Sequence, residues 1–183
     1  MFKALRSGPI ILYLIGEDNL PDVRSMLEGY SDSGYMLTEL EKSYVPKFDE
    51  AGRRTKYGFY STLDGELAGL SLLGASSWKD QRGYTGADTF THMRGRGVAP
   101  GSKPHLFYLA FEILGLNRLE TGCFVSNVAS KRSIEKTAGF RLDGVLREYG
   151  LSPARRFEDE YRYSILKRDW LGLYDKAAVE VIT

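Results

Sequence analysis

Residues 84 to 115 read YTGADTFTHMRGRGVAPGSKPHLFYLAFEILG, and the fold is most readily inferred from this stretch. The segment from Tyr84 to Met93 is predicted to form a strand. Residues 94 to 99 follow with two glycines and two arginines, a composition that an ordinary strand does not tolerate. Apolar side chains then recur at helical spacing until Gly115: Leu106, Leu109, Ala110, Ile113 and Leu114. We therefore expect a strand, a glycine-rich turn and a long helix in succession.

The turn between this strand and this helix is an expected anion-binding site. The first N–H groups of a helix have no intrahelical partner, and the helix dipole adds roughly half a positive charge there. Gly95 and Gly97 let the backbone approach an oxyanion without an intervening Cβ. Arg94, Arg96 and Lys103 are expected to supply positive charge nearby. A pyrophosphate group fits such a site.

The other elements are predicted from hydrophobic periodicity and from turn signals. Asp64-Gly65 separates two strand-like runs and predicts a hairpin, because both central residues of such a turn need positive φ. The remaining expected elements are a strand at 10–15, helices near 20–27 and 35–44, a strand at 118–125, a helix from Asn127 to Ala138, and strands at 140–151 and 157–166. The predicted order is β-α-α-β-β-β-α-β-α-β-β.

Length and composition limit the class of protein. A chain of 183 residues, 43% of them hydrophobic, suffices for one domain that buries roughly two-thirds of its unfolded surface. We expect one domain over 1–174 and a tail over 175–183 that is mobile beyond Tyr174. The 25 lysines and arginines nearly cancel the 24 acidic residues, which argues against a nucleic-acid partner. The apolar run at 9–15 is too short to span a membrane, so we expect a cytoplasmic protein.

Cysteine usage excludes two further kinds of site. Cys123 is the only cysteine, so no internal disulfide framework exists, and no cluster of cysteine and histidine has metal-ligand spacing. We therefore expect no metal. Cys123 lies in an apolar strand without a supporting histidine and aspartate, so a buried small hydrophobic role is preferred to that of a nucleophile.

Two glycine-rich nucleotide loops fit the turn poorly. The P-loop pattern fails because Gly101, Ser102 and Lys103 stand in the wrong order. The dinucleotide fingerprint G-x-G-x-x-G is met only as Gly95-x-Gly97-x-x-Pro100, with a proline in place of the third glycine. Glu120, the candidate for the acidic residue of that motif, lies early in the following strand instead of at its end. A hairpin upstream also argues against a doubly wound parallel sheet.

A third kind of loop matches the residues better. Arg94 to Ala99 has the pattern R/Q-x-x-G-x-G/A, and the segments that follow are YLAFEILGLNRLE (108–120), NVASKRSIEK (127–136), AGFRLDGVLRE (138–148) and EDEYRYSILKRDW (158–170). This chain resembles the GNAT superfamily of acyl-CoA N-acetyltransferases, and within it the branch of the ribosomal-protein N-terminal alanine acetyltransferases. The resemblance covers about residues 84–170. The first eighty residues match only in the order of their elements.

The resemblance implies a GNAT fold of the α/β (α+β) class, with a central mixed, mostly antiparallel seven-stranded sheet flanked by helices. It implies that acetyl-CoA is the donor and that a primary amine attacks its thioester directly. Backbone groups at 89–93 would contact the pantetheine arm and the thioester carbonyl, and the strand at 118–125 would splay away to admit the amine. The residues implied to bind the cofactor are Thr91, His92, Met93, Arg94, Gly95, Arg96, Gly97, Val98, Ala99, Gly101, Ser102, Asn127, Ser130 and Arg132.

The sequence offers candidates for the catalytic residues. Ser130 matches the family's N-x-x-S and is the candidate acid for the departing thiolate, although Asn127 as a plain helix cap with an exposed Ser130 is the alternative. For the base the candidates are His92, Glu120 and a water chain to backbone carbonyls. Pro100 and its neighbours depart from the family pattern, so the helix is expected to begin near residue 102 or 103.

Three functions compete. The first is an N-acetyltransferase acting on a protein N-terminus or a small-molecule amine, as a monomer or homodimer. The second is a non-catalytic acyl-CoA sensor, favoured by the lack of an obvious catalytic carboxylate in the strand before Arg94. The third is a dinucleotide-dependent oxidoreductase.

Overall fold

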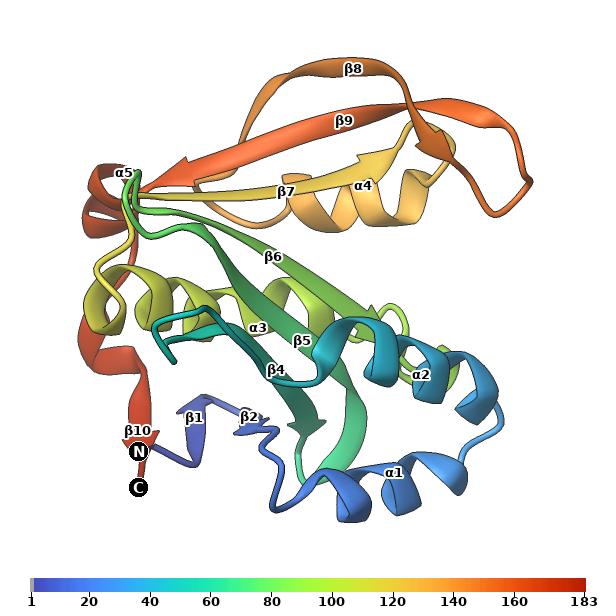
Figure 1. The fold of residues 1–183 in the computed structure, drawn as a ribbon, viewed down its shortest axis with the longest axis vertical. Coiled ribbons are helices and arrows are strands. Elements are labelled where there is room, and N and C mark those ends of the chain that lie inside the picture. The colour runs from blue at the N-terminus through green and yellow to red at the C-terminus, as the bar shows by residue number, and fades with distance from the viewer. Residues whose placement is uncertain (1) are drawn as a thin grey trace.

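A computed structural model describes residues 2–183 and contains one twisted ten-stranded sheet with helices on both faces (Figure 1). Nine strands follow in the order β10-β1-β2-β4-β5-β6-β7-β9-β8, and β3 pairs with β4. The strands are β1 Ala4–Ser7, β2 Ile10–Leu14, β3 Lys47–Phe48, β4 Arg54–Leu63, β5 Glu66–Ser77, β6 Arg82–Thr89, β7 Arg118–Phe124, β8 Arg141–Leu151, β9 Phe157–Leu166 and β10 Glu180–Ile182.

The α-helices follow β2, β6, β7 and β9 along the chain. The helices are α1 Leu20–Glu28, α2 Ser33–Glu39, α3 Val98–Tyr108, α4 Val128–Glu135 and α5 Lys167–Leu173. Two of them extend into π-helical turns, α2 through Leu40–Tyr44 and α3 through Leu109–Ile113. Short 3-10 turns cover Thr91–Met93 and Lys176–Ala178.

The pairing of β6 with β7 is parallel and short. It covers three residue pairs and ends at Tyr84 opposite Glu120. Beyond that pair the two strands diverge, as Figure 1 shows. We call this divergence the β6–β7 fork, with arms at 85–89 and 121–124 and its closed end at Thr85. The predicted splaying of the two strands is thus present in the structure.

Hydrogen bonds show which helix covers each face of β6. Lys103 of α3 contacts Thr85, and Tyr44 of the α2 extension contacts Asp88. Because side chains alternate along a strand, residues 85 and 88 point to opposite faces. The helix α3 therefore covers one face of the fork and the α2 segment covers the other. The core between sheet and helices contains Phe59, Phe107 and Trp170, all essentially inaccessible to solvent.

The fold class and the order of the principal elements agree with the sequence prediction, and so does the hairpin turn. Asp64 has φ of +52° and Gly65 of +85°, as its position between two strands requires. The strand count was underestimated, because β1, β3 and β10 are additional. These three strands are only two to four residues long, and such short segments have no resolvable periodicity.

Two predicted boundaries next to the turn were wrong. The strand ends at Thr89, and Thr91–Met93 forms a 3-10 turn. The helix begins at Val98 and not near residue 102, because Gly97 at φ +82° acts as its N-cap and Pro100 falls in the first turn, where a missing N–H costs nothing.

The C-terminal tail also differs from its prediction. The segment beyond Tyr174 is not free, because β10 pairs antiparallel with β1, with Ile182 opposite Ala4. The two chain ends therefore lie side by side at one edge of the sheet (Figure 1).

Within residues 2–183 no helix has both the length and the hydrophobicity needed to cross a bilayer.

Candidate active site

The glycine-rich turn is open and preformed. Gly95 and Gly97 have φ of +79° and +82°, and a Cβ built on either glycine would meet no atom within 4 Å. Both conformations strongly favour glycine, so the backbone shape is fixed by these residues. Gly97 precedes the first turn of α3, where the N–H groups of Val98 and Ala99 have no intrahelical acceptor. The turn therefore presents backbone donors and space to an anion.

Two arginines flank this turn, whereas the lysine lies elsewhere. Arg96 is exposed and lies 3.4 Å from Glu66, and Arg94 is also exposed. Lys103 was expected near the phosphate groups, but its side chain is only 5% exposed and points at Thr85 on β6. The expectation was wrong because the helix begins earlier than predicted, which turns residue 103 toward the sheet.

The flanking residues predicted to bind the cofactor are largely engaged within the protein. Thr91 donates its N–H and its hydroxyl to Asp32 Oδ2, at 2.9 and 3.1 Å. Met93 is fully buried. The hydroxyl of Ser102 donates to the carbonyl of Val98 at 2.8 Å, inside the helix.

Gly101 packs against β2. A Cβ at this position would overlap the Cδ1 atom at the end of the Ile10 side chain, so a larger residue would require that side chain to move. Gly101 therefore faces the sheet and not the open side of the turn.

Asn127 and Ser130 lie where α4 begins, beside the other arm of the fork. The Asn127 side chain accepts the N–H of Ser130 at 3.0 Å and therefore caps the helix. Burial raises the pKa of the Cys123 thiol on β7, and the nearby Ser130 hydroxyl opposes this shift. A thiol that is harder to ionise is a poor nucleophile, in agreement with the sequence interpretation. Arg132 is exposed on the same helix.

His92 lies in the 3-10 turn and not in the strand. Its Nε2 is 3.4 Å from Glu66 Oε1, and its ring stacks on Tyr30 with centroids 5.3 Å apart. The two contacts place the imidazole between the α1–α2 connection and the start of β5.

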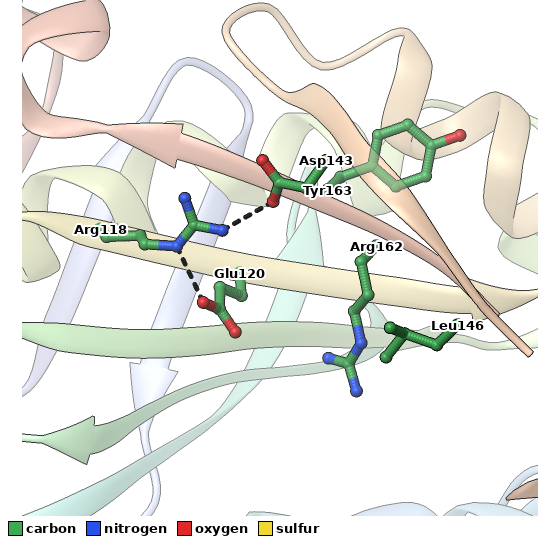
Figure 2. A pocket seen from close by; sticks show the side chains of 6 residues that line it. All are labelled: Arg118, Glu120, Asp143, Leu146, Arg162 and Tyr163. Carbon is green, nitrogen blue, oxygen red and sulfur yellow. Dashed lines mark hydrogen bonds and ion pairs between the residues drawn. The ribbon is translucent and has the colours of Figure 1, made fainter. Parts of the chain in front are cut away.

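Glu120 lies on β7 at the last pair before the fork, and an arginine holds its carboxylate. Arg118 Nε is 2.8 Å from Glu120 Oε1, and its Nη2 is 2.7 Å from Asp143 Oδ2. Figure 2 shows this arginine between the two carboxylates, in a surface pocket that Leu146, Arg162 and Tyr163 also line. Glu120 is therefore committed to an ion pair.

The structure reveals a carboxylate that the sequence reasoning missed. Asp88, on an arm of the fork, accepts hydrogen bonds from the Tyr35 hydroxyl at 2.7 Å and from the Tyr44 hydroxyl at 2.6 Å. Burial, and then the negative charge of Asp88, raise the pKa of both tyrosines, so both remain donors. The strand before Arg94 therefore does contain a carboxylate, contrary to the sequence interpretation. The alternation of side chains along Tyr84–Thr89 could have placed Asp88 on one face of the strand. It could not identify Tyr35 and Tyr44 as the partners of Asp88, because they lie far away in sequence.

Metal chemistry has no evident site in the described chain. Across residues 2–183 no group of three histidine, cysteine, aspartate or glutamate side chains is arranged to hold a metal ion.

Comparison with known proteins relates this chain to acetyltransferases. No family model matches the sequence. A Bacillus subtilis (strain 168) protein named "Putative ribosomal N-acetyltransferase YdaF" is 31% identical over 109 residues, which are 60% of this chain and 58% of that protein. The chain therefore spans less than two-thirds of the length of this curated relative.

Solved structures extend the likeness to nearly the whole fold. The crystal structure of a "putative acetyltransferase" superposes with a TM-score of 0.72 at 21% identity, covering 97% of this chain and 92% of that one. A dodecameric spermidine N-acetyltransferase from Vibrio cholerae superposes with a TM-score of 0.67 at 17% identity, covering 91% and 99%. The chain has the GNAT acetyltransferase fold, and the resemblance inferred from residues 84–170 is confirmed at that level.

Proposed function

We propose that the chain is an N-acetyltransferase that moves an acetyl group from acetyl-CoA directly to a primary amine. One observation carries the proposal: two glycines with positive φ hold an open turn at the N-terminus of α3, beside the β6–β7 fork. A ligand with a pyrophosphate and a narrow arm matches this order of features. The names of the relative and of the similar structures support the same activity.

The turn is proposed to bind the pyrophosphate. The free N–H groups of Val98 and Ala99 donate to it, and Arg94 and Arg96 add positive charge. The pantetheine arm then lies between the arms of the fork. Arg132, exposed on α4, is proposed to contact a further phosphate of the cofactor.

The transfer needs a neutral amine, a polarised carbonyl and a proton donor for the thiolate. The amine nitrogen bonds to the carbonyl carbon, the C–S bond breaks, and its electron pair passes to sulfur. We assign the proton donor to Ser130, whose N–H is fixed by Asn127. The acceptor binds as an ammonium group and loses one proton before it attacks, to one of the candidate bases from the sequence: His92, Glu120 or a water chain to backbone carbonyls. The second proton, which the nitrogen loses after attack, restores the Ser130 hydroxyl.

The acceptor is proposed to be a cationic amine, either a protein N-terminus or a small molecule. Asp88 faces the α2 side of the fork, opposite α3, and two tyrosines fix its carboxylate. A positioned carboxylate binds an ammonium group through a charge-assisted hydrogen bond. The word "ribosomal" in the name of the B. subtilis relative favours a protein acceptor. A carboxylate in this position weakens the alternative of a non-catalytic sensor, which the thiol-release assay tests directly.

Release of free thiol from acetyl-CoA, followed with a panel of peptide and small amines, tests this function. The wild-type protein should release thiol with at least one cationic amine. At an acetyl-CoA concentration 100 times its Kd, the protein should gain about 2.7 kcal/mol of stability. Stabilisation by a nicotinamide dinucleotide in place of acetyl-CoA would instead support the oxidoreductase.

The phosphate loop is tested by Gly97→Val. Gly52→Val is the matched control, because Gly52 has a similar φ of +74° and equally open surroundings in a distant turn. Both variants should lose about 1–2 kcal/mol of stability through backbone strain. Only Gly97→Val should lose stabilisation by acetyl-CoA. Equal protection of both variants by acetyl-CoA would show that the cofactor binds elsewhere.

The acceptor assignment is tested by Asp88→Asn. The variant should raise the KM for a cationic amine about tenfold or more, because a charge-assisted hydrogen bond becomes a neutral one. The KM for acetyl-CoA should stay unchanged. Tyr35→Phe, which leaves the carboxylate in place, should have a smaller effect. An unchanged amine KM in Asp88→Asn would remove Asp88 from the acceptor site.

A further inference from the structure

Lys103 is a buried cation that has no role in the proposed reaction as derived from the turn, Ser130 and Asp88. Its side chain, on the second turn of α3, is 5% exposed. Its Nζ has one hydrogen-bond partner, the hydroxyl of Thr85, at 3.2 Å. Across residues 2–183 no carboxylate lies within ion-pair distance of this ammonium group. An ammonium group carries three N–H donors, so two remain without a protein acceptor.

Such an arrangement is unfavourable for folding alone. Moving an ammonium group out of water carries a large desolvation penalty, which a single neutral hydroxyl does not offset. Burial accordingly lowers the pKa of Lys103 to about 8, and the more distant charge of Asp88 opposes this shift. The surrounding core positions of α3 carry apolar side chains such as Leu106 and Ala110. A buried titratable group of this kind is a candidate functional residue.

The position of Lys103 in the fork suggests its role. Thr85 directly follows Tyr84, the last residue of β6 that pairs with β7, so the ammonium group lies at the closed end of the fork. The phosphate turn lies past the other end of this strand segment. From Thr85 to Thr89 the strand spans about 13 Å. A pantetheine arm of comparable reach, with its phosphates at the turn, would bring its thioester to the closed end.

We propose that the Lys103 ammonium group stabilises the negative charge that develops on the thioester during transfer. This inference rests on the proposed function. When the amine bonds to the carbonyl carbon, charge develops on the carbonyl oxygen, and when the C–S bond breaks, it passes to sulfur. We assign this stabilisation to the two N–H groups of Lys103 that lack a protein acceptor, while the lysine keeps its protons and Ser130 supplies the proton to sulfur. A fixed cation in a site without water is an effective stabiliser of such charge.

Lys103→Met tests the inference, because methionine matches the length of the lysine stem without its charge. We expect kcat to fall about 100-fold, with little change in the KM for acetyl-CoA. The melting temperature should rise, because the desolvation penalty disappears. Lys79→Met is the control: Lys79 is exposed in the turn before β6, and neither quantity should change.

A second variant separates charge from hydrogen bonding. Lys103→Gln keeps a donor for Thr85 and carries no charge, so its kcat should be about as low as that of Lys103→Met.

Wild-type kcat in either variant would overturn the inference, and so would a lowered melting temperature in Lys103→Met that accompanies the loss of activity. If the wild-type protein releases no thiol with any amine, the proposed function itself fails. Thiol release by the wild type with undiminished kcat in Lys103→Met would refute only the role of Lys103.

Discussion

At the scale of single residues, Ser130 owes its orientation to its neighbours in sequence. The Asn127 side chain caps α4 and accepts the N–H of Ser130, which fixes where the serine stands relative to β7. Burial raises the pKa of the Cys123 thiol on the arm of the fork, and the nearby Ser130 hydroxyl opposes this shift. The residue types and their spacing predicted the cap, whereas the role of Ser130 as the acid was implied by the resemblance and stays a prediction.

Ser130→Ala should lower kcat by about 10²- to 10⁴-fold and change the KM for acetyl-CoA little, because proton donation matters only as the C–S bond breaks. Steady-state thiol release measures both constants. Ser133→Ala, one turn further along α4, is the control and should behave as the wild type. Unchanged kinetics of Ser130→Ala would remove this residue from the reaction.

At the scale of elements, one glycine determines how the α2 extension lies on the sheet. A Cβ at Gly58 of β4 would overlap the backbone of Tyr44, whose carbonyl oxygen occupies that space. Gly58 therefore permits the close approach that brings Tyr44 to Asp88. The acceptor side of the fork depends on this contact between two elements.

Gly58→Ala should destabilise the protein by about 1–3 kcal/mol, because the Tyr44 segment must move away from β4. The matched control is Gly86→Ala on β6, where a Cβ would meet no atom within 4 Å. Urea denaturation measures both. Equal stabilities of the two variants would contradict the close packing of the α2 extension on β4.

At the scale of the whole molecule, Lys103 links stability to pH. Its pKa is lowered to about 8 from an ordinary value of 10.5, mainly by burial. The charged group that acts on it from β6 is Asp88, while His105, on the same helix, has a pKa lowered by burial and is neutral near pH 8. Below pH 8 lysine is charged in both the folded and the unfolded states, so the penalty of burying the charge is fully present.

Between pH 8 and 10.5 the unfolded chain binds more protons at Lys103 than the folded protein does. The contribution of Lys103 to the free energy of unfolding should therefore rise with pH, by on the order of 3 kcal/mol in total. Denaturation of the wild type and of Lys103→Met at pH 7.5 and 10 measures the difference. The stability gap between them should shrink as pH rises, and a constant gap would contradict the buried charge. Over the same range the catalytic advantage of the wild type should also decrease, because the cation is lost.

The local features of this protein were set by its sequence. The glycine-rich turn, the Asn127 cap and the Asp64-Gly65 hairpin depend on φ angles and hydrogen bonds within a few residues, so their residue types reveal them. The fold class followed as well, because the periodicity of the long elements limits how they pack.

Other features were decided only by the tertiary structure. The contacts of Asp88 with Tyr35 and Tyr44 join residues 53 and 44 positions apart. The pairing of β10 with β1 joins the two ends of the chain. Lys103 stands three residues before Leu106, on the same helical face, but its burial follows only from where α3 begins and how it packs. Side chains distant in sequence meet through the packing of whole elements, and the spacing of residues along one segment does not specify that packing.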